Sequence, residues 1–171
     1  MEQEELKRLL IKAGAYTAKY EKTAQEVREK LEQWTDEELT TAETDWIIEQ
    51  LRKDKFIDED RYAERYIRDK VYSLRKGPIA IRQELRNRGV PARLIEQGLQ
   101  RIPYDDWYSS LRDYLAPRVE RQRAKAKNEY DLRRRLSEAA YRRGYPSDIY
   151  GEVIDGLDLE WSDEDEDKFY Y

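Results

Sequence analysis

Arginine residues at helical spacing are the side chains of this sequence best suited to binding chemistry. Arg61, Arg65 and Arg68 follow at i, i+4 and i+7, which places them on one face of an α-helix. Arg82 and Arg86 repeat the i, i+4 spacing further along the chain. Guanidinium groups bind phosphate and carboxylate oxygens through paired hydrogen bonds. Rows of this kind are therefore typical of a surface that binds a polyanion or an acidic protein.

The charge distribution favours binding over a merely solvated surface. Residues 61–143 carry 22 basic and 11 acidic side chains, whereas residues 1–60 have a net charge of −7 and residues 144–171 a net charge of −9. Any single arginine could instead pair with a carboxylate on its own helix. The candidate residues for binding are Arg61, Arg65, Arg68, Lys76, Arg82, Arg86, Arg88, Arg121, Lys125, Arg133, Arg134, Arg135, Arg142 and Arg143.

Catalytic chemistry has little support in the composition. The sequence contains no cysteine and no histidine, which excludes disulfides, Cys/His metal sites and histidine-based catalysis. The acidic runs 58–60 and 163–167 could suggest a metal site, but a helix cap and a solvated tail explain them better. Lys76-Gly77-Pro78 lacks the preceding glycines of a phosphate-binding loop. We expect no enzyme, no cofactor and no metal.

Apolar residues recur at helical spacing through almost the whole chain, which predicts an all-α fold. Thr23 and Glu26 form a capping box at the start of one helix, and Pro117 predicts a kink or break in another. Trp34 and Trp46 are expected in the core, on either side of a long connector. Most other aromatic residues, which could stack on nucleobases, are expected to pack between helices. The pattern predicts nine helices, beginning near residues 3, 23, 46, 58, 78, 91, 103, 128 and 146.

An internal repeat organises these helices. Gly89 and Pro91 have counterparts 55 residues later in Gly144 and Pro146, and apolar residues between them coincide as well. The spacing predicts three tandem three-helix repeats at residues 3–57, 58–102 and 103–158. Small units of this kind gain burial by stacking, so we expect an elongated, curved helical array. Residues 159–171 form an acidic, aromatic tail that is predicted to be disordered.

The ends of the chain suggest no membrane association. No apolar stretch reaches the length of a membrane span, and the first residues, Met-Glu-Gln-Glu-Glu, are acidic, unlike a signal peptide. We expect a cytoplasmic, monomeric protein that does not bind membranes.

Several ordered motifs resemble the RecX family. They are the entry Phe56-Ile57-Asp58-Glu59-Asp60-Arg61-Tyr62-Ala63, then Lys76-Gly77-Pro78, then Ile81 to Leu85, then Arg88-Gly89-Val90. This series is similar to the second repeat of the family, and Arg142 to Tyr145 are similar to the end of the third. The chain departs from the family pattern in Tyr62, where phenylalanine is usual, in a longer first connector and in its acidic tail.

The resemblance implies a negative regulator of homologous recombination and SOS functions. Its partners would be the RecA nucleoprotein filament and the single-stranded DNA within it. RecX proteins lie in the filament groove and inhibit filament extension, ATP hydrolysis, strand exchange and co-protease activity. The alternative is an autonomous helical module that binds free DNA without RecA, and its affinity would fall steeply with salt. The aromatic residues of the acidic tail, Trp161, Phe169, Tyr170 and Tyr171, could dock on a partner, or the tail could fold back on the basic segment as a nucleic-acid mimic.

Overall fold

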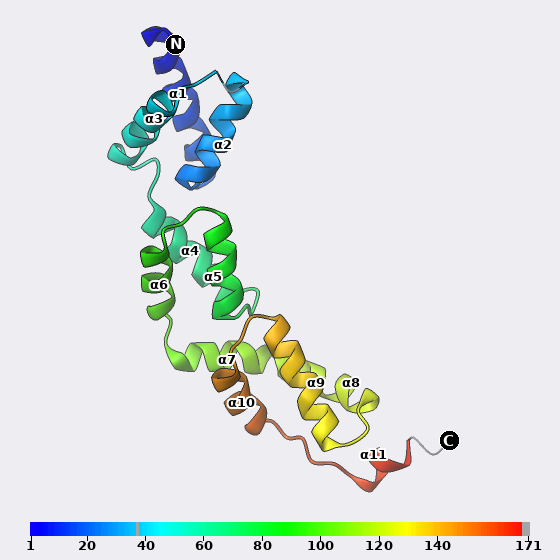
Figure 1. The fold of residues 1–171 in the computed structure, drawn as a ribbon. Helices are drawn as coiled ribbons and strands as arrows, with labels where there is room; N and C mark the ends of the chain where they lie inside the picture. Colours follow the sequence, from blue (N-terminus) through cyan, green and yellow to red (C-terminus); the bar gives the residue numbers. More distant parts are fainter. Residues whose placement is uncertain (37, 169–171) are drawn as a thin grey trace. The chain divides into compact units, whose positions relative to one another are not determined.

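The computed structural model describes residues 1–36 and 38–168, and this part of the chain consists of helices without any strand (Figure 1). The predicted all-α fold is therefore confirmed. The elements are α1 (Gln3–Lys19), α2 (Ala24–Thr35), α3 (Thr41–Lys53), α4 (Glu59–Tyr72), α5 (Pro78–Asn87), α6 (Ala92–Gln100), α7 (Tyr104–Leu115), the 3-10 turn η1 (Ala116–Arg118), α8 (Val119–Lys125), α9 (Glu129–Arg142), α10 (Ser147–Asp155) and α11 (Asp163–Asp167). None of the described helices is long and apolar enough to cross a membrane.

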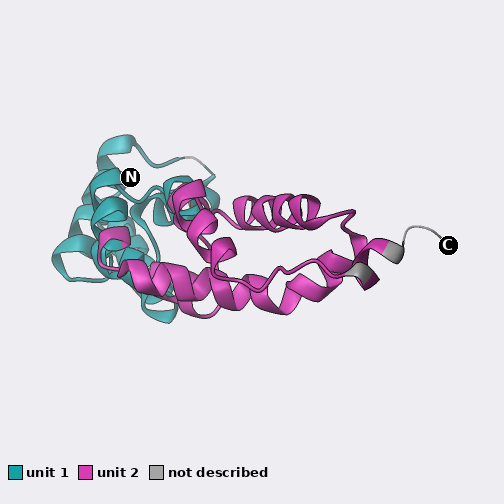
Figure 2. Cartoon of the chain, turned by 90° about the horizontal axis from the view of Figure 1, so that it is seen from below, with its two compact units in different colours: residues 1–66, 84–98 teal, residues 67–83, 99–171 magenta. Residues whose placement is uncertain are grey.

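The chain divides into two compact units, coloured separately in Figure 2. Unit 1 contains Met1–Tyr66 and Glu84–Gly98, and unit 2 contains Ile67–Gln83 and Leu99–Tyr171. The division passes through α4, α5 and α6 and does not coincide with the limits 3–57, 58–102 and 103–158 expected from the repeat. Those limits and the curved array stay predictions.

The core of unit 1 includes one apolar cluster from its first three helices. Val27, Leu31, Ile47 and Leu51 are almost completely buried there. The prediction for Trp46 is wrong: this side chain is 39% exposed, because the helix turns its neighbours Ile47 and Ile48 inward instead. The connector is also shorter than expected, because a capping box between Thr40 and Glu43 starts α3 early.

In unit 2, α10 packs against α7 and α9 around the fully buried side chain of Tyr145. Its hydroxyl lies 3.1 Å from both the Ser110 Oγ and the carbonyl oxygen of Arg75. Because a buried phenol needs such partners, these contacts fix how the α4–α5 loop meets the helices. The break predicted at Pro117 is confirmed, since η1 interrupts the helical path between α7 and α8.

One type of junction occurs once in each unit. In unit 1 the hydroxyl of Thr23, just before α2, donates to the carbonyl of Arg88 at the end of α5, at 2.6 Å. In unit 2 the N–H of Gly77, just before α5, donates to the carbonyl of Arg143 at the end of α9, at 2.9 Å. In both units, a donor at the start of one helix thus satisfies a backbone carbonyl at the end of the corresponding helix, which lies about 55 residues further along the chain.

The backbone geometry of these junctions explains why glycine recurs at them in the sequence. Gly89 and Gly144 have φ angles of 78° and 97°, in the region that disfavours other residues. A Cβ atom on Gly77 would lie 2.3 Å from the backbone carbonyl of Gly144. The junction in unit 2 therefore depends on close backbone approach, whereas a Cβ on Gly89 would meet the side chain of Gln25.

The predicted disorder of the tail is wrong for its described part, up to residue 168. Residues Asp163–Asp167 form α11, and Leu159 is only 3% exposed. The physical reason is a set of contacts between this segment and Arg123 of α8. The aromatic residues Phe169, Tyr170 and Tyr171 lie outside the described part.

Candidate binding surface

The two arginines at the start of α4 share one carboxylate. Arg61 donates through Nε to Oε1 of Glu21 at 2.5 Å, and Arg65 lies 3.3 Å from the other oxygen of the same group. Arg65 is nonetheless mostly exposed, so its outer edge can still bind a ligand. Arg68 is also exposed and lies over the ring of Tyr72, 5.7 Å from its centroid.

Arg88, at the end of α5, stabilises the fold. Its Nη1 donates to the hydroxyl of Tyr62 at 3.0 Å and lies 3.2 Å from Oε1 of Glu26, while its guanidinium lies 5.1 Å from the ring centroid of Tyr66. Burial raises the pKa of Tyr62, so this phenol stays protonated. Of the other candidates on and before α5, Lys76 and Arg82 are half-buried, and Arg86 is exposed.

Arginines on α9 are largely engaged with carboxylates of the same unit. Arg134 lies 2.7 Å from Asp131 and 2.6 Å from Glu138, and Arg135 lies 3.2 Å from Asp131. Arg133 binds Glu129 and Asp155 in the same way. For these three residues the solvated-face alternative therefore describes the geometry better than a free binding surface does.

At the end of α9, Arg142 and Arg143 differ from each other. Arg142 is exposed and lies 4.0 Å from Glu138. Arg143 is half-buried, donates to the carbonyl of Leu74 and lies 5.0 Å from the ring centroid of Tyr114. Arg143 is thus part of the junction within unit 2, and Arg142 is the better placed of the two for a partner.

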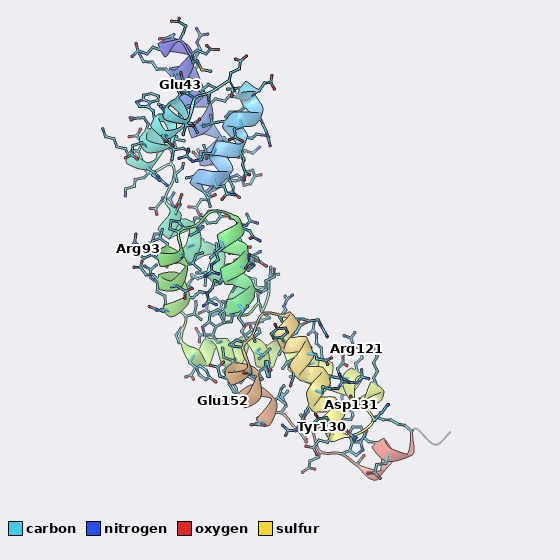
Figure 3. All side chains as sticks on the ribbon, viewed as in Figure 1. Glu43, Arg93, Arg121, Tyr130, Asp131 and Glu152 are labelled. Carbon is cyan, nitrogen blue, oxygen red and sulfur yellow. The ribbon has the colours of Figure 1, made fainter. Side chains whose placement is uncertain are left out.

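Asp131, labelled in Figure 3, controls the pairing on α9. Two hydrogen bonds lower the pKa of Asp131 to about 2. The one from Arg134 has the larger effect, and the one from the backbone N–H of Lys127 has the next largest. A lowered carboxyl pKa means that the ionised form is favoured in the folded chain. The contribution of ionised Asp131 to the stability of the fold is complete above the pKa of an unfolded aspartate, near 4. It is lost as the pH falls through the folded-state pKa of about 2. At neutral pH Asp131 is therefore ionised and holds both arginines.

The substitution Asp131→Asn is expected to release Arg134 and Arg135 for a polyanion. Because exposed ion pairs compete with phosphate contacts, we expect the affinity for single-stranded oligodeoxythymidylate to rise about two- to threefold near 50 mM salt. Fluorescence anisotropy measures this change. Asp148→Asn is the matched control, because Asp148 is exposed on α10 and forms no ion pair within the described residues. An equal gain in both variants would mean that only net charge matters.

Within residues 61–143, six exposed basic residues form no ion pair with the described part of the chain: Arg68, Arg86, Arg93, Arg121, Lys125 and Lys127. Arg93 on α6 and Arg121 on α8 are labelled in Figure 3. Arg93 is not among the binding residues predicted from the sequence. The sequence did contain a signal for this residue, because Arg93 lies in the first turn of α6, where the helix dipole disfavours a cation. A cation in this position does not stabilise its own helix.

Two other features were missed at the sequence level. Tyr130 and Tyr141 on α9 are 78% and 68% exposed, and their spacing of eleven residues places them on one helix face. Glu59, from the acidic run at the start of α4, is buried and accepts from the N–H of Ala24 at 3.1 Å. It thereby caps α2. The described residues contain no cluster of His, Cys, Asp or Glu that could hold a metal ion.

Comparison with known proteins places this geometry in a family. A family model described as "RecX, second three-helix domain" matches residues 58–99, which correspond to α4 through α6. The regulatory protein RecX of Geobacillus sp. (strain WCH70) is 32% identical over 124 residues, which are 72% of this chain and 44% of the relative. The chain belongs to the RecX family.

Other RecX proteins agree with this assignment. RecX of Geobacillus kaustophilus is 30% identical over 64% of this chain and 40% of its own length. The crystal structure of RecX from Lactobacillus salivarius has a TM-score of 0.82 at 21% identity and covers 92% of this chain and 99% of that one. A second RecX crystal structure has a TM-score of 0.74 at 22% identity, covering 86% and 73%. Both structures share the helical fold.

The chain spans about two fifths of the length of these two Geobacillus relatives. The resemblance to the RecX family stated from the motifs is confirmed, and the relatives are named regulatory proteins. The matched segment contains Arg61, Arg65, Arg68, Lys76, Arg82, Arg86 and Arg88 from the predicted surface, and it also contains Arg93. The binding roles of these residues stay predictions.

Proposed function

We propose that this chain is a negative regulator of homologous recombination and SOS functions that binds the RecA filament on single-stranded DNA. It inhibits filament extension, ATP hydrolysis, strand exchange and co-protease activity. One observation carries the proposal: within the segment that matches the RecX family, Arg86 and Arg93 are exposed and have no carboxylate partner among the described residues. The choice of RecA as partner follows from the family resemblance.

The binding would be electrostatic and oriented by geometry. Exposed guanidinium groups can contact DNA phosphates or acidic side chains on RecA subunits. Each phosphate contact releases counterions, so the affinity should fall steeply with salt. A chain bound to the filament in this way would obstruct the addition of further subunits and hold bound subunits in an inactive arrangement.

RecA-catalysed ATP hydrolysis on single-stranded DNA tests the proposal. We expect substoichiometric amounts of the chain to slow hydrolysis severalfold, because a regulator bound to a filament affects many subunits. The same assay with DNA omitted is the control for effects on RecA alone. Unchanged hydrolysis at an equimolar ratio would rule the proposal out.

A second candidate function is direct DNA binding without RecA. It is supported by Arg121, Lys125 and Lys127 of unit 2, which form no ion pair with the described residues, and by the exposed ring of Tyr130. Basic and aromatic side chains together bind single strands. A titration of labelled oligonucleotide without RecA separates the two. Tight binding without any effect on RecA hydrolysis would favour this second function.

A further inference from the structure

The acidic segment after α10 is held on α8 by one arginine. Arg123 donates through Nη1 to the carbonyl of Glu160 at 2.6 Å and through Nη2 to the carbonyl of Asp158 at 3.3 Å. Its Nη1 also lies 3.8 Å from Oδ2 of Asp165 in α11. These contacts leave the side chain of Arg123 only 13% exposed. In sequence Arg123 belongs to the basic segment, but in the fold it binds an internal anionic peptide.

Other residues of segment 158–168 also contact the rest of unit 2. Leu159 is almost fully buried, and Trp161 is half-buried, with an indole N–H that is shielded from solvent without a hydrogen-bond partner in the described structure. The ammonium group of Lys168 lies 4.6 Å from the centroid of the Trp161 ring and donates to the carbonyl of Arg123. The segment 158–168 is therefore docked through specific contacts.

The docking is nevertheless weak enough to be reversible. The helix α11 has five residues, whereas isolated helices in water need roughly 12–15 residues to be stable. The sequence of this helix is entirely acidic, and a short segment of like charges is disfavoured as a helix. Asp165 offsets this in two ways, because it closes a capping box with Ser162 and also faces Arg123.

We propose that segment 158–168 is a resident competitor of polyanions at α8. This inference rests on the basic surface used in the proposed function and adds a mode of regulation to it. The ligand it competes with is the phosphate backbone of a single-stranded nucleic acid. Binding of the backbone displaces the segment, which frees Arg123 and removes its acidic charges from the neighbourhood of α8.

The geometry of α8 determines how this competition works. Arg121 and Lys125 are separated by one turn and share a face, and Arg123 projects about 200° away from Arg121 at 100° per residue. The segment therefore leaves Arg121 and Lys125 uncovered and acts on them through its electric field. A helix is about 10–12 Å across, comparable to the Debye length of about 10 Å in 0.1 M salt. The effect should consequently be strong at low salt and weak at high salt.

Two single substitutions in the full chain separate docking from charge. Asp165→Asn removes the contact with Arg123 and one negative charge. Glu166→Gln removes one negative charge from an exposed side chain that has no partner in the described structure. With a fluorescent oligodeoxythymidylate and no RecA, we expect Asp165→Asn to raise the affinity about three- to tenfold near 50 mM salt. Glu166→Gln should raise it less than about twofold.

The exposure of Trp161 gives an independent measurement. Its acrylamide quenching is obtained as the difference between the chain and its Trp161→Phe variant. Asp165→Asn and, separately, saturating oligonucleotide should both make Trp161 accessible to the quencher. Equal affinities of the two variants, or a Trp161 that stays protected when oligonucleotide binds, would overturn the proposal. If the chain binds no oligonucleotide at all, this inference fails, whereas inhibition of RecA hydrolysis would still support the proposed function.

Discussion

Replacement of Gly144 by alanine is expected to lower the free energy of unfolding by about 2–5 kcal/mol. The φ angle of 97° costs an L-residue about 1–2 kcal/mol. The new Cβ would also lie 2.4 Å from Cβ and 2.6 Å from N of Ala80, and overpacking of this kind costs about 1–3 kcal/mol. Because the contact involves backbone on both sides, neither helix can relax by a side-chain rotation. Urea denaturation followed by circular dichroism measures the change.

Gly151→Ala is the matched control. Gly151 lies inside α10, and a Cβ there would meet no atom within 4 Å. The same substitution should therefore stabilise the chain by about 0.5–1 kcal/mol, the usual helix advantage of alanine. Similar effects of the two substitutions would show that the junction between α5 and α9 is not tightly packed.

Charge reversal of Arg86 and Arg93, which lie in the matched segment and form no ion pair within the described chain, should have the largest effect on binding. For the double variant Arg86→Glu, Arg93→Glu we expect affinity for the RecA filament to fall about 10- to 100-fold at low salt. If both residues contact phosphates, the salt slope of log K should decrease by about two. The physical reason is that both side chains are exposed and form no ion pair within the described chain, so their full charge is available to a partner.

A variant with the same change in net charge controls for nonspecific electrostatics. Lys7→Glu combined with Arg8→Glu alters two exposed residues of α1 that also form no ion pair within the described chain. This control should change filament affinity by less than about threefold. Both double variants should keep the helical circular dichroism spectrum. A control that loses as much affinity as the Arg86 and Arg93 variant would mean that binding depends on net charge alone.

Much of the fold was predictable because helix signals are local. The capping box at Thr23, the break at Pro117 and the helix ends at Gly89 and Gly144 all follow from residue types within a few positions of each other. The absence of cysteine and histidine likewise excluded whole classes of site from composition. The ordered motifs between residues 56 and 99 were sufficient to indicate the family.

Local sequence signals did not predict which residues near Trp46 are buried in the core. Trp46, Ile47 and Ile48 are adjacent apolar residues, and periodicity alone does not decide which of them faces inward. The packing of α1 and α2 against α3 selects the two isoleucines and leaves the tryptophan partly exposed. The choice depends on residues that are distant in sequence.

The amino-acid sequence by itself determined that this protein is helical, that a basic segment lies between acidic ends, and that it resembles the RecX family. Only the tertiary structure decided which cations are available. Arg88 and Arg123 look like any other surface arginine in sequence, yet one binds Tyr62 and Glu26 and the other binds segment 158–168. Arg93 has no such partner among the described residues. The physical reason is that helix formation depends on neighbours within a turn or two, whereas the pairing of a long charged side chain depends on groups that only folding brings within about 4 Å.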